Sequence, residues 1–441
     1  MYINNYKGNT RLHMEQSVEK GCIKMLSFNE KEYIRDLAKK QSELSRLPEM
    51  EEKTKLWYAH NACHAERPVF TIELGTFIKD LMPPPVCTSK EGQNMEWQIQ
   101  QKLLTYEYLR DDQVIDDTFS LGYDSHFIPF HIELKRTNAA SGNDKKSIGY
   151  QVEHIIEDLE KDFHKLKKSY SYVGKPVKDE FDILCEDTFG DILRVVYRSG
   201  FGMSLARQVF HMLGMEGLMY ALYDYPDLVH KMMRMLTDDL LAHLKKMEDA
   251  GILVLNNDNT NVGMGSKGFT TELPASDFSS RDRVLWRDMW GHLDSQETVC
   301  ISSEMFAEFF FPYYKEVGDQ FGFLYYGCCE PVHDIWDNCL SKLDNLKKVS
   351  ISPWCDEQFM GDILRGSKTI YHRKPRPNYL GVDKEFDEAG FRGHLLETIR
   401  AAKGCTLEFT YRDVYTLCGD LYRSKRAYDV ALDMFEKHWG K

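Results

Sequence analysis

Two adjacent cysteines followed by a glutamate, Cys328-Cys329-Glu330, form the most reactive combination in the sequence. They directly follow the apolar run 323–327, which predicts a strand. A thiol at a strand end, just before a helix, can be held as the thiolate, which is the form that attacks electrophiles or binds soft metals. Side chains alternate in an extended segment, so we expect only one of the two cysteines to face a site. The alternative is that both are inert buried thiols.

Polar residues also follow several other candidate strands. Asn256, Asn257 and Asp258 offer hydrogen-bonding groups to a polar substrate or a metal, although a long polar turn would have the same composition. Gln296 and Glu297 follow another candidate strand, and a carboxyl group in a closed pocket can act as a general acid or base. We predict three catalytic residues: Glu297, Asp258 and Asp413. The predicted substrate-binding residues are Asn256, Asn257, Gln296, Tyr326, Trp354, Arg373 and Arg412.

These residues need a framework that brings strand ends together. One β-rich run at 67–74 is joined, after residue 180, by candidate strands at 192–197, 252–257, 284–291, 323–327, 349–353, 369–372 and 406–411. Segments of helical period lie between them, which predicts a parallel α/β sheet, and eight strands favour a closed (β/α)₈ TIM barrel. The competing fold is an open, doubly wound sheet. No G-x-G-x-x-G follows the first strand and no P-loop motif occurs, so the barrel is favoured.

The chain divides into two predicted parts. Residues 1–65 are charged and helix-like, which predicts an N-terminal helical extension, and residues 66–441 contain the barrel. An insertion is expected around 135–180, where the small polar stretch 139–146 reads as an exposed loop. The segment 226–250 predicts an amphipathic helix because its apolar residues recur three or four positions apart.

Composition excludes several classes of protein. The 441 residues carry a formal charge of -13, with no long basic block, which argues against a nucleic-acid-binding protein. No apolar run is long enough to span a bilayer, and the N-terminus lacks the apolar core of a secretory signal, so a cytoplasmic location is expected. The 11 cysteines are odd in number and contain no C-x-x-C pair, so reduced thiols are expected rather than a disulfide framework. The sequence leaves the oligomeric state open.

The runs 321–331 and 350–354, with the closing Arg412-Asp413-Val414, resemble the uroporphyrinogen decarboxylase superfamily. More narrowly, they are similar to its bacterial decarboxylase-like branch, which is related to the methylcobamide methyltransferases. The segments 256–258 and 295–297 fit the same branch. The resemblance covers roughly residues 180–440 and implies a (β/α)₈ barrel.

The resemblance also implies a choice of activities. The zinc methyltransferases hold zinc with a His-x-Cys after one strand and a second Cys after the last strand; here Tyr326 stands at the histidine position and Arg412 at the end of the last strand. Cys405 precedes that strand and is expected at the opposite end of the barrel. The true decarboxylases have an arginine-rich loop near the first strand, and 70–75 contains no arginine.

The leading prediction is a methyltransferase that moves a methyl group between a small methylated molecule, or a corrinoid carried by a partner protein, and an acceptor. Zinc would be held by Cys328 and Glu330. The alternatives are a tetrapyrrole-acting decarboxylase-like enzyme that uses Asp258 and Arg412, and a non-catalytic corrinoid- or porphyrin-binding protein.

Overall fold

The centre of the protein is a parallel sheet of seven strands, seen in a computed structural model that describes residues 26–138 and 150–440. The strands lie in the order β1-β15-β14-β13-β12-β11-β8, and every neighbouring pair is parallel. Their bounds are β1 (Val69–Ile72), β8 (Gly202–Met203), β11 (Trp290–Leu293), β12 (Phe323–Tyr326), β13 (Leu346–Ile351), β14 (Ile370–Arg373) and β15 (Leu407–Tyr411). All six residues of β13 are buried, as expected for a parallel strand covered on both faces.

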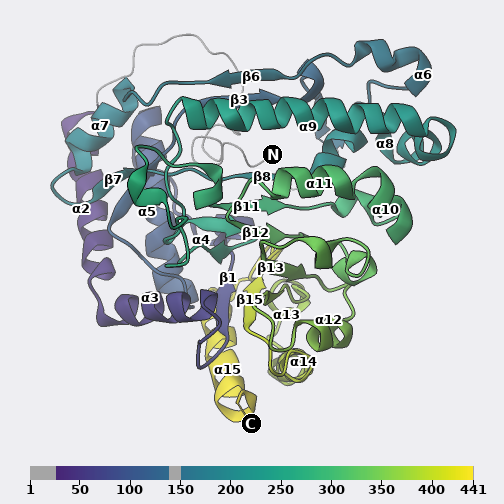
Figure 1. Ribbon diagram of the computed structural model, residues 1–441. Coiled ribbons are helices and arrows are strands. Elements are labelled where there is room, and N and C mark those ends of the chain that lie inside the picture. The colour runs from purple at the N-terminus through teal and green to yellow at the C-terminus, as the bar shows by residue number, and fades with distance from the viewer. Residues whose placement is uncertain (1–25, 139–149, 441) are drawn as a thin grey trace.

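Helices surround this sheet (Figure 1). Helix α9 crosses the upper part of the view, α11 lies beside β11 with α10 next to α11, and α12 to α15 occupy the lower part. The longer helices are α2 (Phe28–Ser45), α3 (Pro48–Asn61), α5 (Lys90–Leu104), α7 (Glu180–Phe189), α8 (Leu205–Asp224), α9 (Pro226–Asp249), α14 (Glu388–Ala401) and α15 (Arg423–His438). The shorter helices are α4 (Ile78–Leu81), α6 (Leu159–Asp162), α10 (Ser303–Phe309), α11 (Phe311–Gly318), α12 (Glu357–Leu364) and α13 (Asn378–Gly381).

The predicted alternation of strands and helices is confirmed in outline. The expected strands near 67–74, 323–327, 369–372 and 406–411 correspond to β1, β12, β14 and β15. The amphipathic helix predicted at 226–250 is α9, whose apolar side chains are almost completely buried. The short strand β8 had no counterpart among the predicted strands.

A closed eight-stranded barrel is not confirmed, because β1 and β8 are the two ends of the strand order. The predicted strand at 192–197 forms β7 (Arg194–Tyr197), but it pairs with β2 (Thr118–Leu121) in a separate two-stranded ladder. Two antiparallel ladders contain β3 (Ser125–Ile128) with β6 (Tyr170–Val173) and β4 (Arg136–Asn138) with β5 (Tyr150–Val152).

Two aspartates occupy the outer edge of β1. The main-chain N–H of Phe70 donates to Asp112 (2.8 Å) and that of Ile72 donates to Asp111 (2.7 Å). Asp112 also accepts from Arg67 (2.7 Å) and from the hydroxyl of Tyr428 (2.7 Å). Side chains therefore satisfy the edge amides of β1 that a neighbouring strand would otherwise bind.

We expect Asp112→Ala to lower the free energy of unfolding by about 3 kcal/mol, because it removes a fully buried carboxylate and leaves its donors unpaired. Urea unfolding measures this loss. Asp117→Ala is the matched control, because Asp117 forms an exposed ion pair with Arg194 that should contribute less than about 1 kcal/mol. Equal losses in the two variants would contradict the role given to Asp112.

The strand predicted at 252–257 is wrong. This segment is irregular, and Asn256 bonds the main-chain N–H and C=O of Trp290 at the start of β11. The chain then turns into a hairpin, β9 (Asn261–Gly263) and β10 (Ser266–Lys267), which packs against the inner face of the sheet. Both glycines around its tip are needed. They have positive φ, and an added Cβ would lie 2.6 Å from the Tyr325 ring at Gly263 and 2.7 Å from Thr410 at Gly265.

A group of charged side chains is buried beneath this hairpin. Glu408 of β15 accepts from Lys348 (3.0 Å) and from Ser266 of the hairpin (3.1 Å), and its carboxylate lies 3.2 Å from the ring of His60. The side chains of Glu408, Lys348 and His60 are fully buried. Burial alone would raise the pKa of Glu408, but the charges of His372 and Lys348 hold it well below its ordinary value.

The predicted N-terminal extension contains α2 and α3. Helix α2 packs against α5 and α7 in a second hydrophobic core that includes Ile34, Ile99 and Phe119. The predicted insertion around 135–180 contains β4, β5, α6 and β6, whereas the polar loop expected at 139–146 lies outside the described residues.

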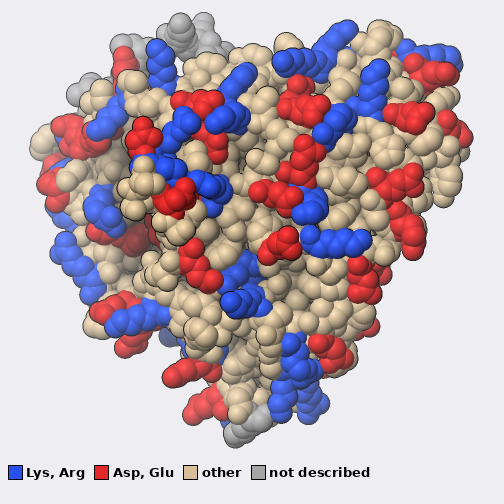
Figure 2. Space-filling view, viewed as in Figure 1, with Lys and Arg blue, Asp and Glu red and all other residues tan. Residues whose placement is uncertain are grey.

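Basic and acidic side chains are interspersed over the face shown in Figure 2, which has no broad basic area. Such a distribution offers no extended surface for nucleic-acid phosphates on that face. Among the residues described here, no helix is both long and apolar enough to cross a membrane.

Candidate functional site

A paired-thiol site lies where β8, β11, β12 and β14 end. The carboxyl ends of neighbouring parallel strands meet at one edge of a sheet, and in barrel-like α/β proteins this edge carries the chemistry. We define the thiol site by the residues that interact there: Arg207, Asp294, Glu297, Cys328, Cys329, Glu330 and Lys374.

The two cysteine side chains contact each other. Their Sγ atoms are 3.5 Å apart, and both residues are half-buried. The preceding Gly327 has a φ of 102°, a left-handed conformation that turns the chain sharply at the end of β12. Ser350 donates to the main-chain carbonyl of Cys328 (2.9 Å), which fixes the turn against β13.

The two thiols have opposite acidities. The hydrogen bond from Cys328 and the nearby positive charge of Lys374 lower the pKa of Cys329 to about 7. The same hydrogen bond, together with burial, raises the pKa of Cys328. The Cys328 contact and the charge of Lys374 therefore favour Cys329 as the sulfur that ionises first. This assignment differs from the sequence interpretation, which favoured Cys328.

Lys374 supplies a buried positive charge beside the two cysteines. It is 5% exposed, and its ammonium Nζ is buried without a hydrogen-bond partner among the described residues. Its charge acts on both cysteines. An unpaired buried ammonium is costly, so its position is best explained by an anion, either the Cys329 thiolate or a group of a bound substrate.

The carboxylate of Glu330 binds the main chain around the cysteines and does not face a cavity where a ligand could bind. Its carboxylate accepts from the main-chain N–H of Ser295 (2.8 Å) and from that of Cys328 (2.9 Å). Burial and the nearby Asp294 raise the pKa of Glu330 to about 7. We therefore regard Glu330 as a positioning residue. The sequence also suggested a helix after the cysteines, but only a short 3₁₀ turn, Val332–Ile335, follows.

Arg207 organises the acidic residues beside the thiols. It donates to Glu297 through Nε (2.6 Å) and to Asp294 through a terminal nitrogen (2.8 Å). Glu297 also accepts from Ser204 (2.9 Å), which is the N-cap of α8. Sequence reasoning missed Arg207 because the two-residue strand β8 before it gives almost no pattern. A serine cap followed three residues later by arginine was the available signal.

The three predicted polar residues 256–258, at the end of the segment 252–257 and just after it, lie away from the thiol site. Asn256 bonds the main chain at the start of β11, the opposite edge of the sheet from the cysteines. Asn257 donates to the carbonyl of Leu273. Asp258 receives two hydrogen bonds from Arg198, at 2.6 and 2.7 Å. Because 252–257 is not a strand, its end does not coincide with the carboxyl edge.

Three other predicted substrate-binding residues point elsewhere. Tyr326 contacts the hydroxyl of Ser295 (2.7 Å) and packs near Tyr314. Arg373 donates to Glu357 and to main-chain carbonyls of β13, while the next residue, Lys374, faces the thiols. Trp354 lies in the loop after β13 and is 70% exposed, which leaves it available only at the outer surface.

The remaining predicted residues lie around the thiol site. Gln296 donates to Glu297 (3.3 Å). Arg412, just after β15, donates to Glu73 (2.8 Å) and contacts the sulfur of Met264 at the hairpin tip. Asp413 is exposed, and its charge acts on Cys329. Cys405 precedes β15 at the other edge, as the sequence indicated.

The described residues do not fit a zinc ion in this arrangement. Both oxygens of Glu330 bind main-chain amides, and within 26–138 and 150–440 no group of three or more His, Cys, Asp or Glu side chains is placed to hold a metal. A structural or catalytic zinc site needs at least three protein ligands. The zinc ligands Cys328 and Glu330 remain a prediction, and no chemical step below depends on them.

The fold and the site together define a parallel α/β protein with paired thiols at the carboxyl edge of its sheet. Comparison with solved structures finds a methyltransferase from Methanosarcina mazei, with 11% sequence identity and a TM-score of 0.47, over 87% of this chain and 98% of that one. No protein-family model and no curated protein sequence matches.

Proposed function

We propose that this protein is an enzyme that transfers a methyl group through the thiolate of Cys329. The observation that carries the proposal is the arrangement of Cys329, Cys328 and Lys374 at the strand ends. One thiol donates to the other, and a buried ammonium without a hydrogen-bond partner acts on both. A thiolate prepared in this way is a nucleophile near neutral pH.

In the proposed step, the sulfur of Cys329 attacks the methyl carbon of a donor. A sulfur–carbon bond forms, the bond from carbon to the leaving atom breaks, and its electron pair departs with the leaving group. The methyl group then passes from sulfur to the acceptor in a second displacement, which restores the thiolate. Cys328 stabilises the thiolate between turnovers through its hydrogen bond.

Lys374 and Arg207 have different proposed roles. Lys374 binds an anionic group of the donor or acceptor, since its ammonium has no hydrogen-bond partner among the described side chains. Arg207 holds Asp294 and Glu297 in place beside the thiols. We therefore assign Glu297, which the sequence analysis named as catalytic, the role of a positioning residue beside the thiols. A corrinoid on a partner protein is the methyl carrier that we propose, on the basis of the resemblance at 321–331 and 412–414.

The residues assigned to tetrapyrrole chemistry do not support that alternative. Asp258 pairs with Arg198, near residues that bond the start of β11, whereas Arg412 follows the end of β15. The two therefore lie toward opposite edges of the sheet. No particular observation favours a binding protein without turnover either.

Methylcobalamin is a direct probe of the proposal. After anaerobic incubation with it, we expect peptide mass spectrometry to find the mass of an added methyl group on Cys329. Cys329→Ser should remove this modification, and Cys405→Ser, which changes a thiol at the other edge of the sheet, should retain it. An unmodified Cys329 in protein that alkylates normally with iodoacetamide would reject methyl transfer through this thiol.

A further inference from the structure

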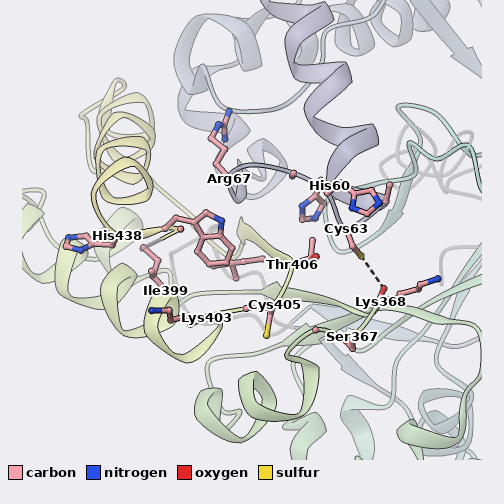
Figure 3. Close-up of a pocket in the computed structure, with 18 of the residues that line it drawn as sticks. His60, Cys63, Arg67, Ser367, Lys368, Ile399, Lys403, Cys405, Thr406 and His438 are labelled. Atoms are coloured by element: carbon pink, nitrogen blue, oxygen red, sulfur yellow. Dashed lines mark hydrogen bonds between the residues drawn. The ribbon is translucent and has the colours of Figure 1, made fainter.

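A second site lies at the opposite edge of the sheet from the thiols. A cavity of about 1130 Å³ opens where the strands begin, between the end of α3, the turns before β14 and β15, and the end of α15. Figure 3 shows Cys63 and Lys368 on one side of it and Lys403 and His438 on another. None of its lining residues belongs to the thiol site, so the cavity needs a separate explanation.

The lining of this cavity is strongly basic. The chain as a whole carries a net charge of -13, yet Glu272 is the one acidic residue among the described residues that line the cavity. The basic lining residues are Arg67, Lys347, Lys368, Arg400, Lys403 and Lys437. A concave surface with this excess of cations attracts anions from solution.

Three of these cations are already paired. Arg67 binds Asp112, Lys347 binds Glu272 and Lys437 binds Asp433. Lys368, Arg400 and Lys403 form no ion pair with any described residue. The basic excess of the cavity therefore rests on these last three.

Main-chain contacts hold the turns that carry these unpaired cations. The N–H of Gly366 donates to the carbonyl of Gly404 (2.9 Å), which joins the turn before β14 to the turn before β15. Arg365 also donates to the carbonyl of Lys403 (2.7 Å). The backbone that positions Lys368 and Lys403 is thus fixed before any ligand arrives.

A buried histidine adds a different kind of group. His60 is fully buried and lines the cavity, and its Nδ1 has no hydrogen-bond partner among the described residues. Its other nitrogen, Nε2, faces the carboxylate of Glu408 at 3.2 Å, so Nε2 carries the proton. Burial lowers the pKa of His60, which keeps the ring neutral. Nδ1 is therefore a buried acceptor without a donor among the described residues.

Apolar side chains complete the lining. Leu396, Ile399 and Trp439 contribute carbon surface beside the cations. An inorganic anion would use the cations alone, whereas the apolar surface suits a larger organic molecule. We propose that this cavity binds a phosphorylated organic small molecule, with its phosphate groups on Arg400, Lys403 and Lys368 and its organic part against the apolar side chains.

Isothermal titration calorimetry with ADP, inorganic pyrophosphate and adenosine tests this site on the full chain. We expect ADP to bind more tightly than pyrophosphate, and adenosine to bind least because it lacks phosphate. Arg400→Gln combined with Lys403→Gln should weaken ADP binding about tenfold or more, since each loses a charged hydrogen bond. Binding of pyrophosphate equal to that of ADP would overturn the organic part of the proposal.

Lys384→Gln combined with Lys425→Gln is the control, because it removes the same charge from exposed positions outside the cavity. Arg400 and Lys403 also lie at the end of α14, where cations favourably meet the helix dipole. A thermal unfolding curve separates this effect from binding. If the Arg400 and Lys403 double variant binds ADP as the control does, or if the folded wild type binds no ADP at millimolar concentration, the site is refuted. Neither result bears on methylation of Cys329.

Discussion

Replacing Lys374 with methionine should slow the reaction of Cys329 with iodoacetamide at pH 7 by about fivefold. The pKa of Cys329 is lowered to about 7 by the Cys328 hydrogen bond and by Lys374. Loss of the cation should raise this pKa by about one unit, which at pH 7 lowers the thiolate fraction from about one half to about one tenth. Peptide mapping at several pH values would follow Cys329 by itself.

The direction of the pH effect is specific. In the wild type, alkylation of Cys329 should rise with pH and reach half its maximal rate near pH 7, whereas in Lys374→Met the midpoint should move upward. Cys328→Ala should also raise the midpoint, because it removes the hydrogen bond to the thiolate. Lys425→Met changes an exposed lysine and should leave the midpoint unchanged. Identical midpoints in wild type and Lys374→Met would show that the ammonium does not act on Cys329.

The same substitution should not destabilise the protein. Methionine has nearly the length of lysine, and the ammonium that it replaces is buried without a hydrogen-bond partner among the described residues. Removal of an unpaired buried charge is expected to leave the free energy of unfolding unchanged or to increase it. If Lys374 serves the reactivity of Cys329 and not the fold, Lys374→Met should show slower alkylation together with an equal or higher free energy of unfolding.

The largest expected effect on stability is at Glu408. Glu408→Gln leaves the buried charge of Lys348 without its carboxylate and should lower the free energy of unfolding by about 3 to 5 kcal/mol. Adding Lys348→Met should recover part of this loss, because the double variant removes both charges. Urea unfolding of the two variants gives the comparison, with Glu51→Gln in an exposed ion pair as the control, which should change the free energy of unfolding far less.

The effect of Glu408 should depend on pH. Its pKa in the folded protein lies well below the ordinary value of 4.5. The carboxylate therefore contributes its full stability above pH 4.5 and loses that contribution as the pH falls through the folded pKa. The difference between wild type and Glu408→Gln should be constant near neutral pH and should shrink below pH 4.5. A difference that grows on acidification would contradict an ionised Glu408.

Much of the secondary structure followed from local pattern. Helix α9 was predictable because its apolar residues recur at helical spacing, and that spacing selects one buried face. The strands β12, β14 and β15 were predictable as short apolar runs between helical segments. Segment 252–257 has similar composition but is irregular, because Asn256 uses its side chain to bond Trp290. Such a long-range bond has no local signature.

The thiol site was partly predictable. The cysteine pair after β12 was identified from its place at a strand end, and the predicted Glu297 shares Arg207 with Asp294 beside this pair. Arg373 was named from the sequence and Lys374 was not, because alternation along a strand shows that neighbours face opposite sides but not which one faces inward. The structure places Lys374 toward the thiols and Arg373 toward Glu357.

The sequence by itself determined the parallel α/β class and a reactive thiol pair at a strand end, since both follow from residues close together in the chain. The tertiary structure brought the Cys328 contact and the charge of Lys374 to Cys329 across the strand ends, which lowers the pKa of that thiol. It also gathered a basic cavity from segments near residues 60, 368, 403 and 438. Charges this far apart in the chain acquire a common electrostatic effect only when folding brings them together.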